Sequence, residues 1–67
     1  MNIRVNDQPQ TVAEAATLTD LLAALGHAGR KGIAVAVNDA VVARSAWPER
    51  RLAEGDRVLV IQATQGG

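Results

Sequence analysis

The sequence is short, has no net charge and contains no cysteine, and these properties exclude several classes of protein. Its 67 residues suffice for one small domain, whose core supplies only about 3–5 kcal/mol of stability. A chain without cysteine forms no disulfide, thiolate metal site or catalytic thiol. Seven basic residues against seven acidic ones leave no basic stripe for nucleic acid. No stretch reaches the roughly 18 apolar residues of a membrane span, and the N-terminus lacks the apolar segment of a signal peptide. We therefore expect a cytoplasmic protein that binds neither nucleic acid nor a membrane.

The first segment is predicted to form a β-hairpin. Residues 1–5 (MNIRV) alternate between apolar and polar side chains, a pattern typical of a half-buried strand. Residues 6–9 (NDQP) favour a turn, and the proline should delay pairing because it lacks an N–H group. Residues 10–12 (QTV) then return as a short second strand.

The next segment has the features of an amphipathic helix. Thr17 is a suitable N-cap, and Asp20 at the third helical position completes a pair like a capping box. Gly26 suits the left-handed position after a helix, and residues 27–32 (HAGRKG) follow as a loop. One face of the helix carries leucines at helical spacing: Leu18, Leu21, Leu22 and Leu25.

A second hairpin is predicted after this loop. Residues 33–37 (IAVAV) alternate again, and residues 40–43 (AVVA) pair back after a turn at Asn38 and Asp39. The sequence "VND", which contains the two residues of this turn, also occurs in the first hairpin. We interpret both copies as turns rather than as calcium or acid–base sites.

The chain then crosses to its last strand. Residues 45–48 (SAWP) are interpreted as an irregular crossing segment with a short helical turn through Glu49 and Arg50. Residues 53–56 (AEGD) indicate a turn, and residues 57–62 (RVLVIQ) form the last strand. The charged residues between Trp47 and this strand are of both signs, so we interpret them as a solvated loop: Glu49, Arg50, Arg51, Glu54 and Asp56.

The resulting order ββαβββ predicts an α+β domain over residues 1–62. One helix covers one face of a mixed sheet, and the last strand, entering after a long crossing, pairs parallel with the first. This is the β-grasp, or ubiquitin-like, arrangement. We expect residues 63–67 to be a flexible tail ending in Gly66 and Gly67.

The last strand is apolar on both faces, although a single helix can cover only one of them. We place Val58 and Val60 under the helix. The open face should then be a surface for a partner protein, formed by Leu59, Ile61, Ala34 and Ala36. The alternative is that the crossing segment folds over this face and hides it with Trp47.

No catalytic or metal-binding group is expected, so the chemistry must be performed on this protein by others. His27 is the only histidine, and we interpret it as an ordinary solvated loop residue. The C-terminal carboxylate is ionised at neutral pH, since its pKa is about 3.5, but an enzyme can convert it to a reactive acyl-adenylate. Gly67 and Gly66 carry no Cβ, so a narrow channel in a partner can admit them, and we expect Gln65 to thread in behind Gly66. When extended, the five residues 63–67 span roughly 16 Å, which is long enough to enter a partner's active site while the folded domain stays outside. The alternative is a frayed end with no role.

The chain resembles the sulfur carrier proteins of thiamine biosynthesis, the ThiS family, along essentially its whole length. The resemblance is carried by "NDQ" in the first hairpin, "TLTDLLAALG" in the helix, "AVAVNDAVVARSAW" through the second hairpin, and "LAEGDRVLVIQATQGG" at the end. The "VND-x-x-V-x-R" stretch with its following Trp47, and the "EGD" turn, are fairly specific in combination.

This resemblance implies a carrier that is not an enzyme and binds no cofactor itself. An E1-like enzyme uses ATP to adenylate the carboxylate of Gly67, which is then converted to a thiocarboxylate. The sulfur comes from cysteine through a cysteine desulfurase, and a thiazole synthase receives it. Three alternatives remain: a sulfur carrier for molybdenum cofactor synthesis, a ubiquitin-like protein modifier, and a plain interaction domain with an idle tail.

Overall fold

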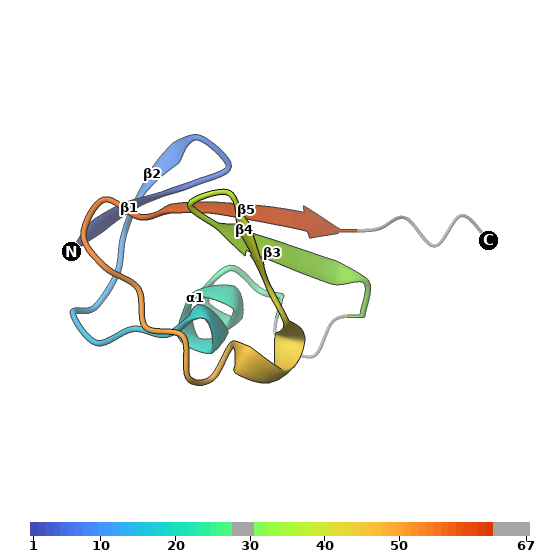
Figure 1. Ribbon diagram of the computed structural model, residues 1–67. Helices are drawn as coiled ribbons and strands as arrows, with labels where there is room; N and C mark the ends of the chain where they lie inside the picture. The colour runs from blue at the N-terminus through green and yellow to red at the C-terminus, as the bar shows by residue number, and fades with distance from the viewer. Residues whose placement is uncertain (28–30, 63–67) are drawn as a thin grey trace.

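The computed structural model describes residues 1–27 and 31–62, which form one sheet with a helix on one of its faces (Figure 1). The strand order across the five-stranded sheet is β2-β1-β5-β3-β4. The β1–β5 pair is parallel, and the other pairs are antiparallel. The expected ββαβββ fold is confirmed. Its elements are β1 (Asn2–Val5), β2 (Gln8–Thr11), α1 (Leu18–Ala24), β3 (Ile33–Val37), β4 (Ala40–Val42), the short 3₁₀ helix η1 (Arg44–Ala46) and β5 (Arg57–Gln62).

Both hairpin turns adopt left-handed backbone conformations. The φ angles are 49° and 67° at Asn6 and Asp7, and 50° and 71° at Asn38 and Asp39. Two successive residues with positive φ match the right-handed twist of the flanking strands, and asparagine and aspartate tolerate this conformation. The interpretation of both "VND" copies as turns is therefore confirmed.

The start of β2 was predicted too late. Pairing resumes at Gln8, and Pro9 lies opposite Arg4 within the ladder. The backbone N–H of Arg4 points the other way and donates to Asp56 O at 2.9 Å, so this pair needs no hydrogen bond from proline. A proline is tolerated here because β2 is an edge strand.

Helix α1 begins with the expected capping box. Thr17 Oγ1 accepts a hydrogen bond from the backbone N–H of Asp20 at 3.2 Å, and Asp20 Oδ2 accepts one from the backbone N–H of Thr17 at 3.0 Å. Gly26 follows the helix with a φ of 82°, as its predicted left-handed position requires.

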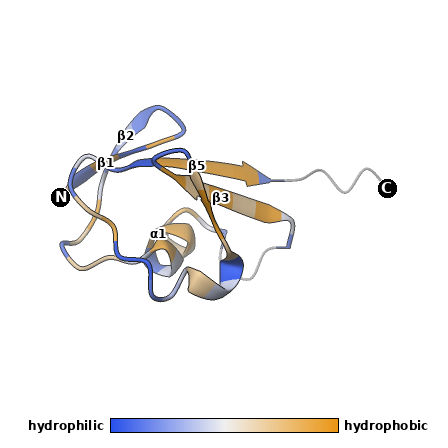
Figure 2. Cartoon of the chain, in the orientation of Figure 1, coloured by the Kyte–Doolittle hydropathy of each residue, from blue (hydrophilic) through white to orange (hydrophobic). Residues whose placement is uncertain are grey.

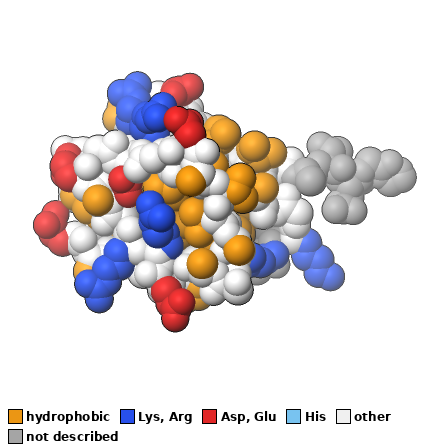
Figure 3. All heavy atoms as spheres, viewed as in Figure 1, with side chains coloured by type: hydrophobic (Ala, Val, Ile, Leu, Met, Phe, Trp, Pro, Cys, Tyr) orange, Lys and Arg blue, Asp and Glu red, His pale blue; other side chains and the backbone are white. Residues whose placement is uncertain are grey.

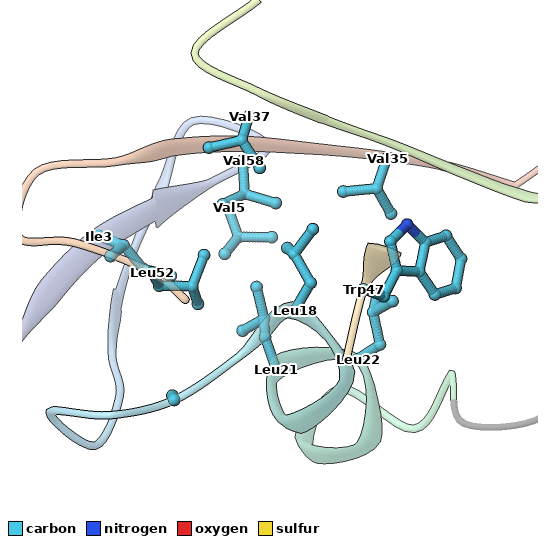
Figure 4. Close-up of a cluster of buried hydrophobic side chains, with 11 residues drawn as sticks. Ile3, Val5, Leu18, Leu21, Leu22, Val35, Val37, Trp47, Leu52 and Val58 are labelled. Carbon is cyan, nitrogen blue, oxygen red and sulfur yellow. The ribbon is translucent and has the colours of Figure 1, made fainter. Parts of the chain in front are cut away.

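The core lies between α1 and one face of the sheet (Figure 4). Leucines of α1 point toward valines of β1, β3 and β5 in the close-up, and the buried set is Ile3, Val5, Ala16, Leu18, Leu21, Leu22, Val35, Val37, Trp47, Leu52 and Val58. Burying each large aliphatic side chain contributes about 1.5–3 kcal/mol. The crossing segment between β4 and β5 adds Trp47 and Leu52 to the side chains of α1 in this core.

The crossing segment runs on the helix side, so the alternative with Trp47 over the open face is wrong. Trp47 is 7% exposed within the core, and its Nε1 donates to Val42 O at 3.0 Å. Leu18 N donates to Arg50 O at 3.0 Å, and Leu52 N donates to Ala16 O at 2.9 Å. These bonds tie the segment to the start of α1, so no described residue of the crossing segment covers the other sheet face.

Two details of the crossing segment differ from expectation. Its helical turn is η1, which comes before the predicted position, and hydrogen-bonded turns continue to Arg50, whose N–H donates to Ala46 O at 2.9 Å. Asp56 is not solvated, because only 8% of it is exposed. Its Oδ2 accepts from Ala53 N at 2.8 Å, and its Oδ1 accepts from Asn38 Nδ2 at 3.0 Å. These bonds satisfy the buried carboxylate and close the turn before β5.

Candidate functional site

Strand β5 carries the chain toward the residues that the sequence assigns to sulfur transfer. It occupies the centre of the sheet, with β1 parallel on one side and β3 antiparallel on the other. The predicted sulfur-bearing Gly67, with Gly66 and Gln65, lies outside the described residues, as does the whole predicted tail, 63–67. The described part of the site is therefore the strand and the face that precede the tail.

The alternation within β5 places its side chains as predicted. Val58 is 3% exposed in the core, whereas Leu59 and Ile61 are 48% and 53% exposed on the open face. In the antiparallel ladder, Ala36 lies opposite Leu59, and Ala34 lies opposite Ile61. These small neighbours leave the two large side chains uncovered.

One more apolar residue belongs to this face, and the sequence interpretation did not include it. Val41 in β4 lies opposite Ala36 and is 83% exposed. The predicted pairing of residues 33–37 with residues 40–43 already puts Val41 beside Ala36, so the sequence contained the signal for its position on the open face. We call this surface the open-face patch: Ala34, Ala36, Val41, Leu59 and Ile61. Strands β3 and β5 are largely hydrophobic (Figure 2), and hydrophobic side chains gather at the end of the sheet where β4, β3 and β5 lie (Figure 3).

Charged residues border the open-face patch at the hairpin turns. Arg57 forms an ion pair with Asp39 at 2.9 Å, and Arg4 Nη2 donates to the backbone carbonyl of Asp7 at 3.2 Å. All four residues line a hollow of about 350 Å³, and Leu59 is also in its wall. An apolar centre beside a polar rim is the usual composition of a protein-binding surface.

The two turn asparagines also bind β5 through their side chains, which the sequence did not reveal. Asn6 Oδ1 accepts from Val60 N at 2.8 Å, and Asn6 Nδ2 donates to Val60 O at 3.2 Å. Asn38 Oδ1 accepts from Arg57 N at 3.0 Å. Asn6 and Val60 are far apart in sequence, so local pattern alone contains no signal for this contact.

The side chains of the described residues do not form a metal centre. Within 1–27 and 31–62, no group of three His, Cys, Asp or Glu side chains is arranged as metal ligands would be. His27 is half-buried rather than freely solvated, and its backbone N–H donates to Leu22 O at 2.8 Å. Over the same ranges, no helix is both long and apolar enough to span a bilayer.

A mixed five-stranded sheet with one helix across one face, and with its first and last strands parallel at the centre, is the β-grasp fold of ubiquitin-like domains. The ThiS family model matches residues 3–67, and the chain therefore belongs to the ThiS family. It is 34% identical to the sulfur carrier protein ThiS of Escherichia coli (strain K12) over 67 residues, covering all of both chains.

Solved structures agree with this membership. The crystal structure of the thiamine biosynthesis protein ThiS from Geobacter metallireducens superimposes with a TM-score of 0.84 at 36% identity, covering all of both chains. A solution structure of a thiamine biosynthesis protein from the same organism gives a TM-score of 0.81 at 36% identity, covering all of this chain and 88% of that one. The resemblance read from the motifs is confirmed, and the chain is a carrier-type protein rather than a catalyst.

Proposed function

We propose that this protein carries sulfur as a thiocarboxylate on Gly67 for the formation of the thiazole ring in thiamine biosynthesis. The observation that carries the proposal is the full-length similarity to the Escherichia coli sulfur carrier, together with a family match that extends to residue 67. The names of the relatives favour thiamine over molybdenum cofactor synthesis and over protein modification.

The chemistry starts from an unreactive carboxylate. Its oxygen attacks the α-phosphorus of ATP on an E1-like enzyme, which gives an acyl-adenylate at Gly67 and releases pyrophosphate. A donor sulfur at the sulfide oxidation level then displaces AMP and leaves the thiocarboxylate. When a cysteine desulfurase delivers the sulfur as a persulfide, a thiol reductant supplies the two electrons that release it. The thiocarboxylate sulfur is a soft nucleophile that a thiazole synthase can accept.

The domain contributes recognition rather than catalysis in this scheme. We assign the open-face patch to the docking of the activating enzyme and the thiazole synthase, because exposed aliphatic side chains beside β5 are an unfavourable surface until a partner buries them. Docking there directs the chain that follows β5 toward the partner. ATP is bound by the activating enzyme, and the carrier itself needs no cofactor. Because activation consumes ATP, we expect the reaction in the cytoplasm.

The proposal is tested by intact-mass measurement of the carrier after loading. The purified protein is incubated with ATP, the E1-like enzyme, cysteine, a cysteine desulfurase and a thiol reductant. We expect the mass to rise by the difference between one sulfur and one oxygen atom, with the change mapped to the C-terminal peptide. Omitting ATP is the matched control and should abolish the change.

Two outcomes would contradict this function. An unchanged mass with the cognate activating enzyme argues against a sulfur carrier. Attachment of the carrier to lysines of other proteins, dependent on Gly66 and Gly67, would instead assign it to the protein modifiers.

A further inference from the structure

The parallel pairing of β1 with β5 ends at Asn6. The backbone N–H of Asn6 donates to Val58 O at 2.9 Å, after which the hairpin turn takes the chain away from β5. Strand β5 nevertheless continues to Gln62. Its next residue with polar backbone atoms facing β1 is Val60, because these atoms alternate between the two sides of a strand.

The side chain of Asn6 takes the place of the missing backbone neighbour. Its Oδ1 accepts from Val60 N at 2.8 Å, and its Nδ2 donates to Val60 O at 3.2 Å. A primary amide combines an acceptor and a donor, so one side chain satisfies both backbone atoms of Val60. Asparagine also tolerates the left-handed conformation of this turn, where φ is 49°.

Beyond Val60, the pairing of β5 in the described residues is with β3 alone. Ala34 lies opposite Ile61, and Ile33 lies opposite Gln62. Among the described residues, Val60 is thus the last residue of β5 that is hydrogen-bonded on the β1 side. It lies between Leu59 and Ile61, the two large side chains that β5 contributes to the open-face patch.

We propose that Asn6 is a positioning residue: its amide holds Val60 so that Leu59 and Ile61 face a docking partner and the chain leaves the sheet in a fixed direction. The inference rests on the proposed function, because the direction matters only if the C-terminus is loaded by another protein. Without the amide, a fraction of the molecules has the end of β5 displaced, and the apparent affinity for the activating enzyme falls by that fraction.

The second hairpin provides a matched comparison within the same molecule. Asn38 occupies the equivalent place in its turn, with a φ of 50°. Its Oδ1 accepts from Arg57 N at 3.0 Å, and its Nδ2 donates to Asp56 Oδ1 at 3.0 Å. It therefore binds the beginning of β5, far along the strand from the C-terminal end.

The experiment compares Asn6→Gly with Asn38→Gly, because glycine keeps the left-handed turn and removes the side chain in each. Amide hydrogen exchange is measured across β5, and initial rates of loading are measured over a range of carrier concentrations. Asn6→Gly removes both hydrogen bonds to Val60, and it should speed exchange at Val60 by at least about fivefold, the effect of losing even one of them. It should raise the KM of the activating enzyme severalfold and leave kcat unchanged. Asn38→Gly should speed exchange at Arg57 and leave the KM unchanged.

A third variant guards against simple unfolding. Asn6→Asp keeps the acceptor for Val60 N and loses the donor to Val60 O, so its KM should lie between those of the wild type and Asn6→Gly. If the two glycine variants raise the KM equally, Asn6 contributes only to the stability of the fold, and the proposal is overturned. An unchanged KM in Asn6→Gly would also overturn it.

The proposed function fails separately, when the wild-type chain is not loaded at all. In that case the hydrogen-exchange data alone test whether the side-chain amide of Asn6 holds Val60. Unchanged exchange at Val60 in Asn6→Gly would refute the positioning role.

Discussion

Ile61 shows how far a single residue could be placed from the sequence. The alternation of β5 put it on the open face, and it is 53% exposed there. Its function as a docking residue is a prediction. Ile61→Asp should leave the free energy of unfolding within about 0.5 kcal/mol of the wild type, as for other surface changes. It should weaken the complex with the activating enzyme at least tenfold, because an interface core excludes unpaired charge. Isothermal titration calorimetry measures this affinity.

Thr19→Asp is the matched control for that variant. Thr19 is exposed on α1, so the control adds the same charge on the helix side of the sheet and should leave the affinity unchanged. If both variants weaken the complex equally, the added negative charge is the cause, and the open-face patch is not the docking surface. Unfolding of Ile61→Asp would contradict the exposed position.

Other side-chain roles were not predictable at this scale. Asn6 and Asp56 are turn residues by sequence, and both assignments are correct for the backbone. Their side chains, however, bind Val60, Asn38 and Ala53. Two of these contacts depend on which strands become neighbours, and neighbouring residues in the sequence do not specify that.

At the scale of the element, helix α1 depends on its N-terminal cap. Thr17→Ala removes the bond from Asp20 N to Thr17 Oγ1 and should lower the free energy of unfolding by about 1 kcal/mol. For a domain of this size the melting temperature should fall by about 4–8 °C. Urea and thermal unfolding followed by far-UV circular dichroism measure both quantities.

Thr19→Ala is the control for the cap, because Thr19 is an exposed helical residue. Alanine has the higher helix propensity, so this change should be neutral or slightly stabilising. If the two threonine variants lose the same stability, the capping box does not determine the stability of α1.

The strands with the clearest local sequence patterns were the ones predicted most accurately. Strands β3 and β5 were predicted with the bounds that the structure has. The alternating residues of β3 lie between Gly32 and the Asn38-Asp39 turn, and the apolar run of β5 begins directly after the turn at residues 53–56. The position of η1 and the path of the crossing segment were not. That path is set by the bonds of Arg50 and Leu52 to the start of α1, which are long-range contacts.

At the scale of the whole molecule, docking and loading are predicted to be separable. A chain ending at Gln65 lacks Gly66 and Gly67 but keeps the open-face patch. It should show no mass increase in the loading reaction. It should also inhibit loading of the full chain competitively, with an inhibition constant close to the KM of the full chain. Steady-state loading rates at several inhibitor concentrations measure this constant.

The truncated chain carrying Ile61→Asp serves as the control and should not compete. If the truncated chain without this change fails to compete as well, affinity lies in the terminal residues and the open-face patch is not the docking surface. Sequence reasoning predicted the two faces of the sheet correctly, because one helix leaves one face open. Only the structure placed the crossing segment on the helix side.

The position of Trp47 gives the molecule an internal optical probe. It is the chain's single aromatic residue, is 7% exposed and has Arg44 5.2 Å from the centre of its ring. Its intrinsic fluorescence should shift to the red when the core opens to water. A protein that covers the opposite side of the sheet does not touch the indole, so its emission should stay constant through association and report denaturation alone.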